Sequence, residues 1–167
     1  YFDTVPGEGY SVDNLAPGKW HWLRFIAPDG SMSPVGRTKT LPVGKAAKFN
    51  IAIFSCANLG FGEFNAYGHA AARDDIDMVL HMGDYIYEYG RGGYDGGAKF
   101  AARIFPADEI LTLADYRLRY ASYRSDPQLQ ALHANFPVIP NTDDHEGGND
   151  AWEGGAQNHT ADEGDWS

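Results

Sequence analysis

Residues 78–89 read MVLHMGDYIYEY, and this stretch contains the clearest structural signal in the chain. The run from Met78 to Met82 is apolar apart from His81, which is typical of a short buried strand in a parallel sheet. Gly83 and Asp84 follow at once, so the strand ends on a carboxylate. Because open α/β sheets bind ligands outside the carboxyl ends of their strands, Asp84 is a candidate functional residue.

Two further apolar runs have the same arrangement. Residues 49–55 (FNIAIFS) predict a buried strand, and Cys56 follows it directly. Residues 136–139 (FPVI) predict a short third strand, which the run DDHE at 143–146 follows within a few residues. If the three strands are parallel, the segments after them converge at one edge of the sheet.

The segments between these strands predict helices. Residues 65–75 are rich in alanine, Thr112 has the spacing of a capping box, and Asp126 is a good N-cap before Pro127 at the first helical position. The second helix places on one face Leu113, Tyr116 and Tyr120, and the third is predicted to bury Leu129, Leu132 and Phe136. The order strand, helix, strand, helix, helix, strand predicts an α/β domain with at least partly parallel strands.

The first forty residues predict β structure instead. Apolar and polar side chains alternate over residues 20–26, Pro28-Asp29-Gly30 predicts a turn, and a second strand is expected over residues 35–40. Residues 41–48 (LPVGKAAK) read as a linker. We therefore expect this part to be the end of a β-sandwich.

Composition excludes several classes of protein. The chain has 167 residues with 13 Lys and Arg against 23 Asp and Glu, for a formal net charge of −10, and residues 141–167 hold eight acidic residues but no Lys or Arg. A sequence pI near 4.8 argues against general nucleic-acid binding, which needs a basic surface. One cysteine excludes an internal disulfide framework, and no apolar stretch is long enough to predict a transmembrane helix.

Each candidate residue also has an ordinary structural interpretation. Cys56 fits a buried small apolar side chain, Gly83 and Asp84 fit a turn, and His81 fits a hydrogen-bonded core histidine. The acidic C-terminal region fits a solvated surface. The run Asp143-Asp144-His145-Glu146 is harder to explain structurally, because four consecutive ionisable groups after a buried strand need solvent or a cation to compensate them.

A centre with two cations would account for the residue types. A carboxylate such as Asp84 can bridge two cations, thiolate and phenolate ligands suit iron(III), and carboxylate and amide oxygens suit calcium. Paired cations polarise a phosphoryl oxygen, activate a water and stabilise the leaving oxygen. A histidine beside such a centre could then protonate the leaving group.

At these residues the chain resembles the PhoD-like alkaline phosphatases and phosphodiesterases, a branch of the calcineurin-like metallophosphoesterase superfamily. The segments that carry the resemblance are FSC at 54–56, HMGDYIYEY at 81–89, LADYRLRYASYRSDP at 113–127, DDHE at 143–146 and NDAW at 149–152. Thr142 departs from the family pattern, which usually has Trp before DDHE.

The resemblance implies a dinuclear or larger centre of iron(III) with calcium, with other divalent metals as alternatives. Cys56 would be the thiolate ligand, Tyr87 the phenolate ligand of iron and Asp84 the bridging carboxylate. Asp144 would bind the second metal ion, and Asn149 would lie on the calcium side. The imidazole of His145 would act as proton donor or transition-state stabiliser.

The resemblance also implies a fold and an activity. Residues 43–167 would form the first half of a four-layer α/β/β/α metallophosphoesterase sandwich, and residues 1–42 the end of a preceding immunoglobulin-like domain. The activity would be hydrolysis of phosphate mono- or diesters by a metal-activated water. We expect an N-terminal portion of such an enzyme, incomplete without the C-terminal half of the same protein, and extracytoplasmic (periplasmic or secreted). The alternatives are a secreted calcium-binding module without catalysis and an inactive fragment.

Overall fold

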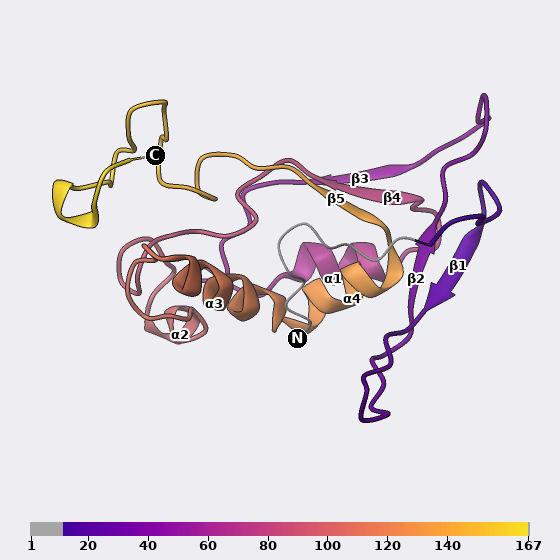
Figure 1. The fold of residues 1–167 in the computed structure, drawn as a ribbon, viewed down its shortest axis with the longest axis horizontal. Helices are drawn as coiled ribbons and strands as arrows, with labels where there is room; N and C mark the ends of the chain where they lie inside the picture. The colour runs from indigo at the N-terminus through magenta and orange to yellow at the C-terminus, as the bar shows by residue number, and fades with distance from the viewer. Residues whose placement is uncertain (1–11, 167) are drawn as a thin grey trace.

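A computed structural model describes residues 12–166, and its centre is a three-stranded parallel sheet covered by helices (Figure 1). The sheet has the order β3-β4-β5. The elements, in chain order, are β1 (Trp20–Leu23), β2 (Gly36–Lys39), β3 (Ile51–Phe54), α1 (Asn65–Ala71), β4 (Met78–His81), α2 (Ala98–Ala101), α3 (Leu113–Arg124), α4 (Pro127–Asn135), β5 (Val138–Pro140) and the 3₁₀ helix η1 (Ala161–Glu163). The predicted α/β class and the three predicted parallel strands are confirmed.

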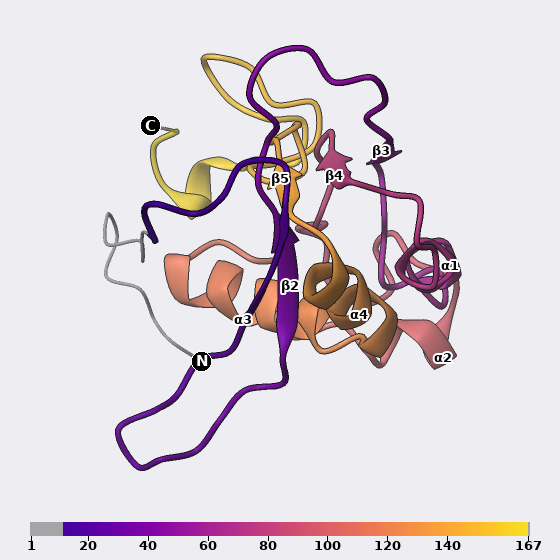
Figure 2. The same ribbon diagram turned by 90° about the vertical axis from the view of Figure 1, so that its right-hand side faces the viewer.

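The helices lie on one side of the sheet in both ribbon views (Figures 1 and 2). Val79 and His81 of β4 are buried, and the hydroxyl of Tyr67 in α1 lies 2.8 Å from Nε2 of His81. His81 is therefore a hydrogen-bonded core histidine. Alternate residues of β3 are exposed instead, with 46% of Ile51 and 64% of Ile53 accessible to solvent.

Both predicted helix caps are present. Thr112 Oγ1 accepts a hydrogen bond from the Asp115 backbone N–H at 3.3 Å, and Asp115 Oδ2 accepts one from the Thr112 N–H at 2.9 Å. Asp126 Oδ1 accepts from the N–H groups of Gln128 at 2.9 Å and Leu129 at 3.1 Å. These bonds satisfy donors that have no partner inside the first helical turn. The residues predicted to face inward from α4 are all buried, namely Leu129, Leu132 and Phe136.

Two helices differ in detail from the expectations. The Ala-rich helix ends at Ala71 and not at residue 75, because Asp75 and Asp77 belong to the chain that enters β4: the Asp75 carbonyl accepts from the Asn50 side chain and the Asp77 N–H donates to the Asn50 carbonyl. Leu113 of α3 is 66% exposed and does not share a buried face with Tyr116 and Tyr120. The buried residues of α3 are Arg119, Ser122 and Tyr123, and the Arg119 guanidinium donates to carbonyls of the preceding loops, such as those of Phe105 and Asp108.

The segment before the linker forms a hairpin, as predicted. Strands β1 and β2 pair antiparallel, with shorter bounds than the sequence indicated, and Gly30 in the connecting loop has φ +84°. Trp20 packs against Phe136, and the Arg37 side chain donates to the Asn135 carbonyl at 2.9 Å. The hairpin thus contacts the C-terminal end of α4.

The assignment of residues 1–42 to an immunoglobulin-like domain, with the boundary at residue 42, stays a prediction, as does the four-layer sandwich. Residues 1–11 and Ser167, which the two predicted domains include, lie outside the described residues. Among the helices of residues 12–166, none has the length and apolar character needed to cross a membrane.

Candidate metal centre

The segments after β3, β4 and β5 meet at the carboxyl edge of the sheet, as the sequence predicted. The backbone N–H of Cys56 donates to the Gly83 carbonyl at 3.2 Å, and that of Ala57 donates to the Asp84 carbonyl at 3.1 Å. Gly83 has φ +113°, and a Cβ placed there would lie 2.5 Å from the backbone nitrogen of Asp143. Only glycine therefore allows the loop after β4 to approach the loop after β5 so closely.

Asp84 is buried at this junction, with 6% of its surface exposed. Its Oδ2 accepts a hydrogen bond from the Tyr87 hydroxyl at 3.2 Å. Its Oδ1 is the buried side-chain oxygen for which no hydrogen-bond partner is found among the described residues. A buried carboxylate oxygen without a donor is costly unless a cation compensates it.

Asp84 also belongs to a group with Asp144 and His145, in which one ligand atom from each residue lies within 4.8 Å of the others. Two carboxylates and an imidazole at this spacing suit a hard or borderline metal ion. The predicted ligands Asp84 and Asp144 are thus brought together with the predicted catalytic residue His145.

Cys56, which is exposed, and the buried Tyr87 are both neighbours of Asp84. A hydrogen bond with Ser55 lowers the pKa of the Cys56 thiol, but burial and the neighbouring Asp84 and Asp143 outweigh it, so that the pKa is raised. Burial, Asp84 and Cys56 likewise raise the pKa of the Tyr87 phenol. Both groups are therefore protonated beside Asp84, and a cation there would be needed to favour thiolate and phenolate.

Asn149 has a different environment. Its side-chain amide nitrogen donates to the side-chain oxygen of Gln157, and its backbone N–H donates to Asn158 Oδ1 at 2.9 Å. Asn149 lies in the segment that follows His145, and its side-chain amide is hydrogen-bonded to Gln157, further along the chain. Its role as a ligand stays a prediction.

A partner of His145 was missed by sequence reasoning. Nδ1 of His145 lies 2.8 Å from Oε2 of Glu88, and these residues are 9% and 1% exposed. The Asn158 amide donates to the other oxygen of Glu88 at 3.1 Å. The ring of Tyr87 lies 4.2 Å from the imidazole, centroid to centroid. The position of Glu88 four residues after Asp84 was visible in the sequence, but nothing local connects it with residue 145.

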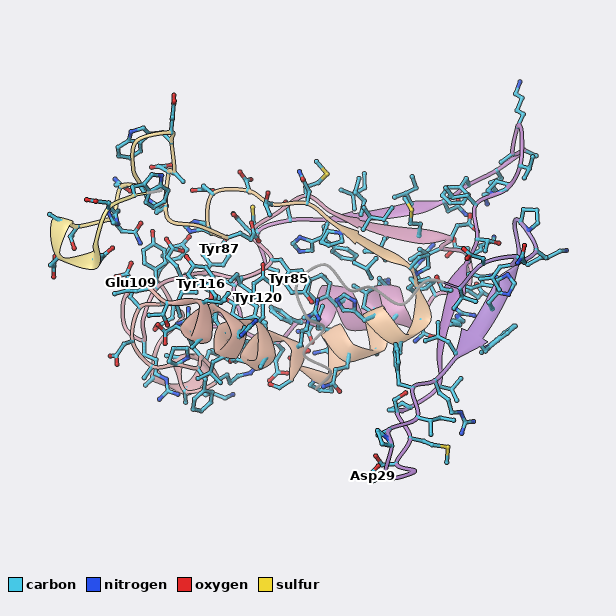
Figure 3. All side chains as sticks on the ribbon, viewed as in Figure 1. Asp29, Tyr85, Tyr87, Glu109, Tyr116 and Tyr120 are labelled. Carbon is cyan, nitrogen blue, oxygen red and sulfur yellow. The ribbon has the colours of Figure 1, made fainter. Side chains whose placement is uncertain are left out.

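The segment from Asp84 to Glu88 lies against α3. Figure 3 shows Tyr85 and Tyr87 on this segment, with Tyr116 and Tyr120 of α3 on the side of the helix that faces it. Tyr85 and Tyr120 stack with their centroids 6.0 Å apart. Arg119 of the same helix donates to the carbonyls of Tyr87 and Tyr89, on either side of Glu88.

A hollow of about 470 Å³ opens beside Cys56 and Tyr87. Phe61 and Tyr94 form an aromatic wall of this hollow and meet edge to face at 4.9 Å, and both are about half exposed. The hollow provides room for a molecule that contacts the candidate ligands.

Comparison with known proteins identifies the family of this chain. The sequence pattern of the family described as PhoD-like phosphatase matches residues 51–167. The chain belongs to this family. It is similar to alkaline phosphatase D of Bacillus subtilis (strain 168), with 44% identity over 137 residues, which are 81% of this chain and 23% of that protein.

A solved structure described as "Structure of PhoD" has the same fold. It matches with a TM-score of 0.70 and 44% identity, over 78% of this chain and 25% of that one. The chain therefore spans about a quarter of the length of these PhoD-like relatives. The family predicted from the sequence motifs is confirmed.

Proposed function

We propose that the protein to which this chain belongs hydrolyses phosphate esters at a metal centre built around Asp84. The observation that carries the proposal is the buried Oδ1 of Asp84, which has no hydrogen-bond partner among the described residues. Asp84 also belongs to a group of two carboxylates and a histidine. Membership of the PhoD-like phosphatase family supports the same reaction class. The metal ligands, the activity of the whole protein and its substrates are parts of this proposal.

Five side chains are the proposed ligands of this centre, and Asp84 would bind both of its cations. Cys56 and Tyr87 would bind on one side of Asp84, and Asp144 with Asn149 on the other. Thiol and phenol groups beside a carboxylate favour iron(III), whereas carboxylate and amide oxygens favour calcium. When bound, such cations supply Lewis-acid stabilisation of the phosphoryl group and lower the pKa of the attacking water.

His145 would act as the proton donor to the leaving oxygen. Because Nδ1 faces the Glu88 carboxylate, Nε2 is the ring nitrogen that remains for the substrate. The buried Glu88 carboxylate would stabilise the imidazolium form and fix the orientation of the ring. The hollow beside Cys56 and Tyr87 would accommodate part of the ester.

The remaining layers of the sandwich belong to the same proposal. The face of the sheet opposite the helices leaves Ile51, Ile53 and Ile139 between 46% and 64% exposed. A second sheet from the C-terminal half of the same protein would cover this face, as expected for the four-layer fold. That half would also supply further metal ligands. An extracytoplasmic location, where calcium is plentiful, completes the proposal.

The experiment is release of 4-nitrophenol from 4-nitrophenyl phosphate and from bis(4-nitrophenyl) phosphate by the full-length protein and two matched variants. Asp84→Asn removes the proposed bridging charge, and Asp74→Asn changes an exposed aspartate. We expect Asp84→Asn to lose at least about 100-fold in kcat/KM, corresponding to about 2.7 kcal/mol, and Asp74→Asn to match the wild type. Retained activity in Asp84→Asn would refute the assignment. Metal binding without hydrolysis in the wild type would favour the calcium-binding module.

A further inference from the structure

The Glu146 carboxylate lies between two of the loops that form the centre. Its Oε1 accepts a hydrogen bond from the Tyr85 N–H at 2.5 Å, and its Oε2 accepts from the Asp84 N–H at 3.1 Å. The same Oε2 accepts from the Asp143 N–H at 2.7 Å. One side chain thus engages three backbone donors, two from the loop after β4 and one from the loop after β5.

Both carboxylate oxygens of Glu146 are therefore hydrogen-bonded. Hydrogen bonds from N–H groups to an ionised carboxylate are about twice as strong as bonds between neutral groups. Glu146 is not a member of the group formed by Asp84, Asp144 and His145. Its oxygens are directed at backbone donors, which is the environment of a residue that orients ligands.

The backbone that Glu146 holds is in an uncommon conformation. Asp84 has φ +51°, in the left-handed region that residues other than glycine seldom adopt. Such a conformation persists where surrounding contacts impose it, and it is common at functional sites. The hydrogen bonds to the N–H groups of Asp84 and Tyr85 flank the Asp84 Cα, so they fix the direction in which its side chain leaves the backbone.

We propose that Glu146 is a positioning residue whose carboxylate ties the loop after β4 to the loop after β5 and thereby aims Asp84 at the metal centre. The inference rests on the proposed function for the role of Asp84 as a ligand. The three hydrogen bonds that Glu146 accepts, here called the clamp, are a property of the metal-free protein. Partners that orient ligands typically contribute about 10- to 100-fold to metal affinity.

Amide hydrogen exchange of the metal-free full-length protein tests the clamp directly. Glu146→Gln keeps the size of the side chain but leaves one acceptor oxygen for three donors, and its NH₂ group faces an N–H. We expect the amides of Asp84, Tyr85 and Asp143 to exchange roughly 10- to 100-fold faster, because each loses a charge-assisted bond. The Met82 amide, bonded to the Phe54 carbonyl at 2.8 Å, should keep the exchange rate of the wild type.

Two further variants serve as comparisons. Glu153→Gln changes an exposed glutamate of the same C-terminal segment and should leave the three amides unchanged. Glu146→Asp keeps the charge on a shorter side chain and should give intermediate exchange rates. If Glu146→Gln does not fold, Glu146→Asp decides the question. Unchanged exchange at Asp84, Tyr85 and Asp143, or equally faster exchange at Met82, would overturn the proposal.

Titration with Co²⁺, followed by its visible absorption, measures the consequence for the centre. We expect the Glu146→Gln variant to bind Co²⁺ about 10- to 100-fold more weakly than the wild type and Glu153→Gln to bind as the wild type does. Weaker Co²⁺ binding with unchanged exchange in the metal-free protein would make Glu146 a direct ligand and overturn its role as a clamp. Absence of Co²⁺ binding and of hydrolysis in the wild type would refute the proposed function, while the exchange rates would still decide the clamp.

Discussion

The imidazole of His145 and the carboxylate of Glu88 form a buried pair, with Nδ1 and Oε2 2.8 Å apart. Asn158 donates to the other oxygen of Glu88, so the carboxylate is engaged on both sides. The pair links the loop after β5 to the segment after β4. In the proposed function, Nε2 of His145 is the ring nitrogen left for the substrate.

Replacement of Glu88 by glutamine should lower kcat in the full-length protein. The amide keeps the shape of the side chain but cannot stabilise an imidazolium, so we expect kcat to fall about 10- to 100-fold with little change in KM. Steady-state kinetics with 4-nitrophenyl phosphate and elemental analysis of the same samples check this. Unchanged kcat at full metal content would contradict the role of Glu88, as would an equal loss in the exposed control Glu153→Gln.

The fold around Glu88 should depend on Arg119. The Arg119 guanidinium is fully buried and donates to the carbonyls of Phe105, Pro106, Asp108, Tyr89 and Tyr87. Lysine has one nitrogen and cannot reach all of these acceptors, so Arg119→Lys should lower the free energy of unfolding by about 3 kcal/mol. Urea denaturation measures this value. Arg117→Lys, at an exposed position of the same helix, should change it by less than about 0.5 kcal/mol.

His133 should make the fold sensitive to acid. Burial, Arg124 and His81 lower the pKa of His133 to about 4, and its Nε2 lies 2.7 Å from the Tyr85 hydroxyl. The unfolded chain, with a histidine pKa near 6.5, binds this proton first, so the stabilisation is complete above pH 6.5 and is lost as the pH falls toward 4. Between pH 7.5 and pH 4.5, protonation of this histidine should lower the free energy of unfolding by about 2 kcal/mol.

The variant His133→Gln isolates this contribution. Glutamine can still hydrogen-bond the Tyr85 hydroxyl but does not titrate. The free energy of unfolding of the variant should therefore fall less between pH 7.5 and pH 4.5 than that of the wild type. Urea denaturation at both pH values gives the difference. Equal losses in the two proteins would show that His133 does not contribute.

The aromatic wall of the hollow should support the candidate ligand Tyr87. The ring of Tyr94 lies 5.9 Å from that of Tyr87 and 4.9 Å from that of Phe61. Tyr94→Ala removes these ring contacts and should lower kcat/KM toward 4-nitrophenyl phosphate about threefold to tenfold. Tyr94→Phe keeps the ring and should retain most of the activity. A loss in Tyr94→Phe equal to that in Tyr94→Ala would assign the effect to the hydroxyl group instead.

Local signals predicted much of this fold. Three short apolar runs predicted β3, β4 and β5, and the caps at Thr112 and Asp126 predicted the starts of α3 and α4, because each depends on residues adjacent in the sequence. The four-residue helix α2 had no such signal. The apolar pattern did not show that Leu113, at the start of α3, is exposed, or that Arg119 is the buried charged residue of this helix.

Only part of the candidate site, likewise, could be predicted from the sequence. Asp84, Asp144 and His145 could be found because each follows a predicted strand, and parallel strands bring such residues together. The roles of Glu88 and Glu146 could not be found from spacing, since Glu88 meets His145 across 57 residues and Glu146 meets Tyr85 across 61. Only the packing of the loops reveals that one carboxylate orients the histidine and the other holds the backbone.

The most direct test of the metal centre is elemental analysis of the full-length protein, purified without chelators, beside Asp84→Asn. We predict that the wild type retains iron and calcium, near one equivalent or more of each, and that Asp84→Asn loses both, because this carboxylate would bind both cations of the proposed centre. A wild type that contains no stoichiometric metal, or an Asp84→Asn variant with the metal content of the wild type, would contradict the account.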